Sequence, residues 1–328
     1  MDEPRGVVNA VADTVRPSVV RRPARLAAPA ALGTALILLV LVTAKHGPEG
    51  RILVDRPVPE AHPQLWGFGH WLTLVQIATL IASGAFLAVY VARSRREGRV
   101  HPVLPVLGGL FVMGLLTDSF ANWTSSAAMN PDLVHYPTNW WFFDVSPTVE
   151  PLINTVAYPY LFLAPALAVT TWLARRPTPR RPLLTVFALT FAIAVPINWV
   201  LVNLFMVRIE YWTYTQIPGW AAVRGGTPWQ YPWTDPLTLA VLTGVTGVLL
   251  WRGTHPPATR PWRQVLVVAL IAALAYVPYN AAWASFRLTN NGDTLAKPWV
   301  FTNTKVYDPK GDYARAGMPG PFFRGMWP

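Results

Sequence analysis

The stretch PVLPVLGGLFVMGLLTDSFANW, residues 102–123, is an apolar run that ends on an acid, an amide and a tryptophan. A helix crosses a bilayer with roughly 20 apolar residues, so this run is long enough to span one. The next 26 residues, 124–149, are rich in Trp, Asn, Asp and Pro and contain no Lys or Arg. The sequence therefore predicts a membrane helix whose polar end meets a loop built like the wall of a pocket.

Similar apolar runs recur along the chain. Hydrophobic residues make up 52% of the 328 residues and charged residues only 13%, whereas soluble domains carry roughly 25% charged residues. We therefore predict an all-α membrane protein, a bundle of about seven transmembrane helices. The helices are expected at 26–45, 70–93, 103–123, 151–174, 183–207, 236–252 and 262–288, of which the sixth is the shortest.

Three parts of the chain are predicted: a basic cytoplasmic segment 1–25, a transmembrane domain 26–288 and a tail 289–328. No small-residue cleavage site ends the first apolar run, which favours a retained helix over a signal peptide. The tail is too polar to span a membrane and too aromatic for an ordinary disordered segment. We expect it to lie on the extracytoplasmic side and to fold over the outer face.

The arginines predict the orientation of the bundle. Sixteen of the 27 basic residues fall in the N-terminal segment and in the connections between predicted helices 2 and 3, 4 and 5, and 6 and 7. Positively charged connections stay in the cytoplasm, so the chain is expected to run N-in and C-out. The net charge of +11 is thus a topology signal, which argues against nucleic acid as a partner.

Polar side chains occur in the outer halves of four predicted helices. Asp118 and Asn122 are four residues apart and share a helix face. Polar groups inside membrane helices are costly and usually face a cavity or one another. The others are Glu150, Asn154 and Tyr158 on the fourth helix, Trp199, Asn203, Glu210 and Tyr211 on the fifth, and Tyr276, Tyr279, Asn280 and Trp283 on the seventh.

Several of these residues also have a purely structural interpretation. Asp118 could bond another helix or pair with Arg208 or Arg287, and Glu210 could pair with Arg208. Glu150 lies in DVSPTVEP, residues 144–151, where either Ser146 caps the helix or Pro151 is its first residue. The polar pattern across four helices nevertheless indicates one outward-opening volume. The skew of tryptophans agrees, since only Trp172, Trp251 and Trp262 of the 16 lie near the inner face.

Other chemistries find little support in the sequence. The chain has no cysteine, which excludes thiol catalysis, and it lacks a P-loop, a dinucleotide-binding glycine motif and a nucleophile elbow. A metal site that combines His62, His70 or His135 with carboxylates stays open, but no paired histidine spacing supports it. We expect neither a metal nor a cofactor.

Three motifs resemble a known family. They are DSFANW (118–123), HYPTNWWFFDVSPTVEP (135–151) and TKVYDPKGDYARAGMPGPF (304–322), and together they resemble the AveC-like spirocyclases, multi-spanning bacterial membrane proteins. The resemblance implies the bacterial cytoplasmic membrane and an enzyme of polyketide biosynthesis. The member that gives the family its name acts in avermectin biosynthesis, where it forms a spiroketal from a dihydroxyketone and also dehydrates it.

Such a reaction needs general acid–base catalysis, so we assign catalytic roles to Asp118 and Glu150, with Asp144 next and Glu210 in reserve. A lipophilic small molecule and membrane lipid are the expected partners. Alternatives are another cyclase or dehydratase acting on a polyketide or isoprenoid, and a carrier or transporter of lipophilic molecules. The expected substrate-binding residues are Asn122, Trp123, Asn139, Trp140, Trp141, Asn154, Tyr158, Asn203, Tyr211, Tyr276, Tyr279, Asn280 and Trp283.

Overall fold

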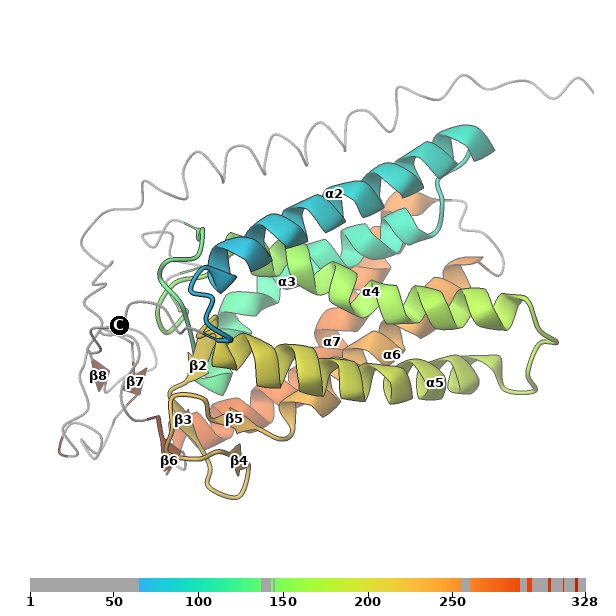
Figure 1. Cartoon of the computed structure of the whole chain (residues 1–328). Coiled ribbons are helices and arrows are strands. Elements are labelled where there is room, and N and C mark those ends of the chain that lie inside the picture. The colour runs from blue at the N-terminus through green and yellow to red at the C-terminus, as the bar shows by residue number, and fades with distance from the viewer. Residues whose placement is uncertain are drawn as a thin grey trace, which may run out of the picture. The chain divides into compact units, whose positions relative to one another are not determined.

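The computed structural model shows a mostly helical protein (Figure 1) and describes residues 65–136, 143, 145–254, 260–289, 294–296, 306–307, 315 and 322–323. The first predicted helix, 26–45, and most of the predicted tail lie outside these residues. The helices are α2 (Trp71–Glu97), α3 (Val103–Ser125), α4 (Leu152–Ala174), α5 (Pro182–Ile197), α6 (Asp235–Thr254) and α7 (Pro261–Leu288).

Six apolar spans in the described part of the chain are long enough to cross a membrane, α5 being counted together with the helical turns that follow it. The predicted helices from 70–93 to 262–288 are therefore confirmed, with ends that differ by a few residues. The outward-facing sides of the outer helices are apolar, as the exposed Leu80 and Ile81 of α2 and Leu270 and Leu274 of α7 show. This arrangement is compatible with an integral membrane protein.

The centre of the bundle is formed by α3, α4 and α6. α3 packs along α7, α5 along α6, and α4 contacts both α3 and α6. A close approach of α3 to α7 uses Gly109, where an added Cβ would lie 2.5 Å from the Cβ of Val268 and 2.7 Å from the carbonyl oxygen of Val265. Small residues at such crossings let two membrane helices come together.

The predicted helix 183–207 is not one uniform α-helix. After α5 the chain continues as a π-helix, η2 (Asn198–Met206), in the same span. The change follows Pro196, which has no N–H to donate and so interrupts the α-helical ladder. The Asn203 side chain donates to the carbonyl of Asn198, five residues earlier, at a distance of 3.1 Å. π-helical turns are rare and occur often at functional sites.

Short strands join the segments at one end of the bundle, a feature that the prediction of an all-helical protein missed. β1 (Ala127–Met129) pairs with β2 (Trp212–Tyr214), β3 (Gln216–Ile217) with β6 (Thr294–Leu295), and β4 (Ala222–Val223) with β5 (Tyr231–Pro232), all antiparallel. β7 (Val306–Tyr307) pairs with β8 (Phe322–Phe323) in parallel. These pairings satisfy backbone groups that loops would otherwise leave unpaired.

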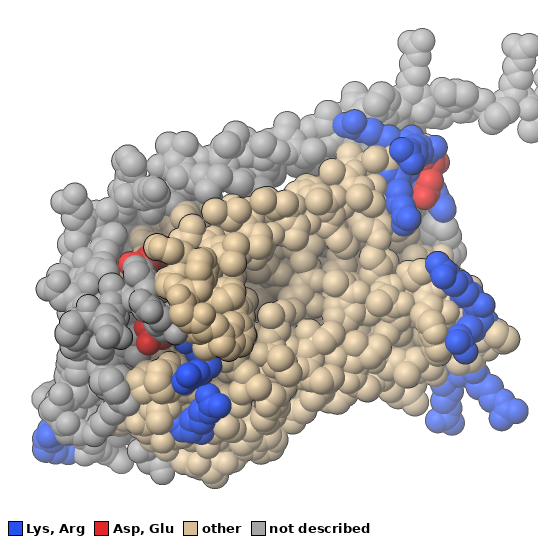
Figure 2. All heavy atoms as spheres, in the orientation of Figure 1, with Lys and Arg blue, Asp and Glu red and all other residues tan. Residues whose placement is uncertain are grey.

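The opposite end of the bundle carries the arginine-rich connections between α2 and α3, α4 and α5, and α6 and α7. Figure 2 shows Lys and Arg gathered at that end, with a smaller group near the strands. The polar ends of α3, α4, α6 and α7 therefore lie on the side away from the main arginine clusters. Which side faces the cytoplasm stays a prediction that rests on the positive-inside rule.

The Gly109 crossing gives a stability prediction. Replacing Gly109 with alanine forces the new Cβ against Val268, and overpacking of this kind costs about 1–3 kcal/mol. Gly114 lies buried on the same helix with nothing within 4 Å of an added Cβ, which makes Gly114→Ala the matched control. Thermal unfolding in detergent should show a lower melting temperature for Gly109→Ala alone, and equal effects of the two variants would contradict this packing.

Candidate active site

Two buried carboxyl groups interact directly at the strand-bearing end of the bundle. Asp118 comes from the last third of α3, and Glu150 comes from the extended residues just before α4. A hydrogen bond joins the two side chains. Their exposed fractions are 6% and 2%. The sequence placed both acids in the outer halves of neighbouring predicted helices, and the structure brings them together as a pair.

Glu150 is positioned by backbone pairing rather than by a helix. Its carbonyl accepts a hydrogen bond from the backbone N–H of Tyr136, and the N–H of Leu152 donates to the carbonyl of Val134, both at 2.9 Å. Pro151 is the N-cap residue of α4, so Glu150 lies outside the helix. The ring of a proline disfavours helical geometry in the residue before it, which explains why Glu150 stays outside the helix.

Both predicted arrangements of the start of α4 are therefore corrected: Ser146 does not cap the helix, and Pro151 precedes its first residue. Instead the Ser146 hydroxyl donates to Oε2 of Glu150 at 2.9 Å. The side-chain amide of Asn122 donates to the same oxygen, also at 2.9 Å. Asn122, one turn after Asp118 on α3, thus bonds the acid that precedes α4.

The pair is short of hydrogen-bond donors, which favours a proton between the two groups. Oδ2 of Asp118 and Oε1 of Glu150 are buried and accept no N–H or O–H bond from the described residues. Burial raises the pKa of Glu150 well above its ordinary value, and the negative charge of Asp118 and the bond to it act in the same direction. The bonds from Asn122 and Ser146 oppose this shift without cancelling it. This shift favours the protonated form of Glu150.

A further polar chain leads away from Asp118. The Asn154 side chain bonds Asp118, and its Oδ1 accepts a hydrogen bond from the hydroxyl of Tyr211 at 2.9 Å. Burial raises the pKa of the Tyr211 hydroxyl, which keeps it a neutral donor. Tyr211 lies just before β2, so the network joins α3, α4 and the segment between η2 and α6.

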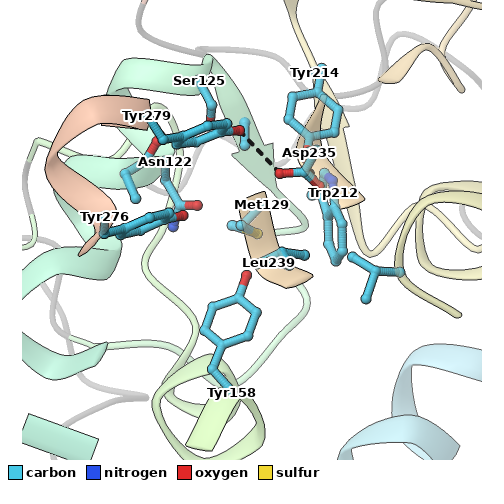
Figure 3. Close-up of a pocket in the computed structure, with 13 residues that line it drawn as sticks. Asn122, Ser125, Met129, Tyr158, Trp212, Tyr214, Asp235, Leu239, Tyr276 and Tyr279 are labelled. Atoms are coloured by element: carbon cyan, nitrogen blue, oxygen red, sulfur yellow. Dashed lines mark hydrogen bonds between the residues drawn. The ribbon is translucent and has the colours of Figure 1, made fainter. Parts of the chain in front are cut away.

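A cavity lies beside this network (Figure 3), and it encloses about 340 Å³ of empty space including its opening to solvent. Asn122 lines the cavity and also bonds Glu150, so it separates the carboxyl pair from the open space. The lining is Ala121, Asn122, Ser125, Ala127, Met129, Tyr158, Val202, Trp212, Tyr214, Asp235, Leu239, Tyr276 and Tyr279.

Asp235 is an acid in the cavity wall that the sequence analysis did not single out. It is the first residue of α6 and is 6% exposed. The hydroxyls of Tyr214 and Tyr279 donate to its Oδ2 and Oδ1 respectively, each at 3.0 Å. An acid at the first position before an apolar run is typical of a helix N-terminus. The local sequence therefore predicts a helix start at Asp235 and gives no indication of a pocket residue.

Comparison with known proteins agrees with the family resemblance of the first two motifs. Residues 94–307 match the family model described as Spirocyclase AveC-like, a range that covers more than half of the chain. The chain belongs to the AveC-like spirocyclase family. No curated protein and no solved structure matches it. The matched range includes both carboxyl sites and every residue of the cavity lining, so the features described above lie inside the family region.

Four of the residues expected to bind substrate in this AveC-like protein line the cavity: Asn122, Tyr158, Tyr276 and Tyr279. Figure 3 shows the Tyr158 hydroxyl pointing into the space, with Asn122 and Tyr276 beside each other at its edge. Tyr276 and Tyr279 stack with ring centroids 5.5 Å apart and planes at 4°. These rings form one aromatic wall.

Other expected residues support the site without lining the cavity. Asn280 accepts a bond of 2.8 Å from Thr124 and so joins α7 to α3. Trp283 packs against Tyr279. Asn203 lies in η2, and the carbonyl of the half-buried Glu210 accepts a bond from Asn130. Asn139, Trp140, Trp141 and Asp144 lie outside the described residues.

The arginines considered as partners of Asp118 bind elsewhere. Arg287 donates to the carbonyl of Trp123 and to the hydroxyl of Ser126, and its guanidinium lies 5.0 Å from the ring of Trp123. Arg287 thereby provides a hydrogen-bond donor for a backbone carbonyl at the end of α3. Arg208 stacks over Trp229 at 4.1 Å. As for metals, the described residues contain no group of three His, Asp or Glu side chains close enough to hold an ion.

The carboxyl pair predicts a pH dependence of stability. Because folding raises the pKa of Glu150, the folded state favours the protonated form. The free energy of unfolding should then fall as pH rises above the unfolded pKa of about 4.3 and should level off above the raised value. Thermal unfolding of wild type measured across this range tests the decline, which Glu150→Gln should largely abolish.

The matched control is Asp132→Asn, which changes an exposed acid in the same outer segment and should leave the decline intact. A wild-type melting temperature that does not fall between about pH 5 and pH 7, as expected for a carboxylate that is already ionised in both states, contradicts the assignment.

Proposed function

We propose that this chain is a membrane-embedded cyclase that forms a spiroketal from a dihydroxyketone polyketide by general acid–base catalysis. Its membership of the spirocyclase family supports a cyclase activity. The observation that carries the proposal is the pair of interacting carboxyl groups behind a tyrosine-lined cavity. Two acids in different environments provide a proton donor and a proton acceptor in one site.

The reaction itself consists of proton transfers and the loss of one water. One hydroxyl of the substrate adds to the ketone and gives a hemiketal. An acid protonates the hemiketal hydroxyl, which leaves as water, and the remaining oxocarbenium ion is captured by the second hydroxyl. No oxidation or reduction takes place, so the proposal requires no cofactor. Loss of a neighbouring proton from the same cation would instead give a dehydrated product, which accounts for a possible dehydratase activity.

Glu150 is the proposed proton donor because its raised pKa keeps it protonated where an ordinary carboxyl group is ionised. Asp118 is its proposed counterpart, which shares the proton with Glu150 before the reaction and is left beside the ionised Glu150 when that proton leaves with the water. The ketone is proposed to bind beside Asn122, whose amide already bonds Glu150 and which lines the cavity. The substrate hydroxyl would displace Asn122 from Glu150 or be oriented by its carbonyl oxygen.

The aromatic wall suits a cationic intermediate and a lipophilic chain. The electron-rich faces of tyrosine rings attract positive charge, and stacked Tyr276 and Tyr279 present such faces next to Tyr158. A rigid wall also limits the folded conformers of the substrate, which selects the hydroxyl that attacks and the face attacked. Control of the stereochemistry of the spiro centre would follow from this restriction.

The site is proposed to open toward the extracytoplasmic side of the bacterial cytoplasmic membrane. This orientation rests on the arginine clusters at the opposite end of the bundle. The proposed orientation assumes seven helices with the N-terminus inside. The segment 1–25 and the first of these helices precede the described residues. A lipophilic substrate would reach the cavity from the outer leaflet.

The test is conversion of a dihydroxyketone by purified protein. Asp118→Asn and Glu150→Gln keep the shape of the side chains but remove the shared proton, and each should lower kcat by about 10²–10⁴-fold. Ser119→Ala is the matched control, because Ser119 is buried beside Asp118 and its hydroxyl has no hydrogen-bond partner among the described residues. Product formation is followed by chromatography and mass spectrometry.

The proposal fails if folded Asp118→Asn and Glu150→Gln form the spiroketal at the wild-type rate. Substrate that binds the wild-type protein but is recovered chemically unchanged would instead indicate a carrier of lipophilic molecules. A changed product that is not a spiroketal would indicate another cyclase or a dehydratase acting through the same pocket.

A further inference from the structure

Asp235 differs from the Asp118–Glu150 pair in its access to the cavity. Asp235 lines the cavity directly, whereas the pair lies behind Asn122. Two tyrosines that also line the cavity, Tyr214 of β2 and Tyr279 of α7, each donate to one of its oxygens at 3.0 Å. Figure 3 shows the carboxylate of Asp235 facing the space across from the Tyr158 hydroxyl.

The two hydrogen bonds indicate an ionised, oriented carboxylate. Each oxygen accepts one hydrogen bond from a tyrosine hydroxyl. An ionised carboxylate accepts with both oxygens, whereas a protonated acid uses one oxygen as a donor. Burial, followed by the negative charge of Asp235, raises the pKa of the Tyr214 hydroxyl, so this tyrosine remains a donor. Each carboxylate oxygen retains acceptor capacity for a further donor from the cavity.

The charge of Asp235 has no cationic partner among the described residues, since its interactions are with the two tyrosines alone. The N-terminus of α6 and the two tyrosine hydroxyls stabilise this buried carboxylate, but no full positive charge from the described residues neutralises it. A positive charge that develops in the cavity would supply the missing partner. The oxocarbenium ion of the proposed reaction is such a charge.

We propose that Asp235 is a catalytic carboxylate, which stabilises the oxocarbenium ion and receives the proton of the second substrate hydroxyl as the spiro ring closes. This assignment rests on the proposed function and adds a residue to it. Tyr214 and Tyr279 are positioning residues that fix the two oxygens of Asp235. The Asp118–Glu150 pair then serves the earlier loss of water, and Asp235 serves the capture.

In the closing step the oxygen of the second hydroxyl forms a bond to the oxocarbenium carbon. The electron pair of the carbon–oxygen π bond returns to the ring oxygen, and the hydroxyl O–H bond breaks as its proton moves to a carboxylate oxygen of Asp235. One proton has left Glu150 with the departing water, and one arrives on Asp235. Exchange through water in the open cavity restores both groups, and the net reaction is dihydroxyketone to spiroketal plus water.

The experiment separates the two steps with full-length protein in detergent and a linear dihydroxyketone that can close to two six-membered rings. Asp235→Asn should lower kcat for spiroketal formation by about 10²–10⁴-fold while KM changes little. In water labelled with heavy oxygen, the cation that is not captured by the second hydroxyl is recaptured by solvent. Enzyme-dependent label in the recovered substrate should therefore persist in Asp235→Asn and disappear in Glu150→Gln.

Thr234→Ala is the matched control for the start of α6, because its hydroxyl has no hydrogen-bond partner among the described residues. It should retain wild-type kcat and labelling. Tyr214→Phe and Tyr279→Phe each remove one of the two bonds and should lower kcat about tenfold with KM unchanged. These two variants decide the question if Asp235→Asn does not fold.

A folded Asp235→Asn, or the two phenylalanine variants in its place, that closes the ring at the wild-type rate overturns the assignment of Asp235 and leaves the proposed function intact. Loss of labelling together with loss of product also overturns it, because Asp235 would then act before the cation forms. Wild-type protein that forms no spiroketal overturns the proposed function and this assignment together.

Discussion

The polar end of the bundle is organised by the need to satisfy two carboxyl groups buried against each other in an apolar interior. A buried carboxylate that lacks hydrogen-bond donors is costly, and two adjacent carboxylates repel, so a shared proton and the available donors stabilise the pair. Asn122 and Ser146 donate to Glu150, and Asn154 bonds Asp118. These donors come from three separate segments of the chain, which must therefore meet at one point.

The other features of this end keep those segments in place. The antiparallel pair of β1 and β2 ties the end of α3 to the segment after η2, and Arg287 of α7 satisfies the carbonyl of Trp123 at the end of α3. The backbone pairing of Tyr136 with Glu150 places the acid before α4 begins. By contrast, the apolar halves of the helices need only length and close packing, as at Gly109. Rigid support around polar groups is what a preorganised acid–base site requires.

Much of this could be predicted from the sequence, because length and hydropathy locate membrane helices and an i, i+4 spacing puts Asp118 and Asn122 on one face. Catalytic roles for Asp118 and Glu150 were predicted from their places in the outer halves of neighbouring helices, but their direct contact was not. The π-helix after Pro196 and strands of two or three residues were not, since neither has a pattern distinct from helix or loop. Asp235 was missed because a helix-starting acid and a pocket acid have the same local sequence, and only the distant tyrosines distinguish them.

Infrared difference spectroscopy of the carboxyl groups tests the shared proton most directly. A protonated carboxylic acid has a carbonyl stretching band that an ionised carboxylate lacks. At neutral pH the wild-type protein should show such a band, and it should vanish in Glu150→Gln and shift in Asp118→Asn, where the hydrogen-bonding partner changes. A wild-type spectrum without a protonated carboxyl band that responds to these two substitutions would mean that both groups are ionised, and would contradict the account.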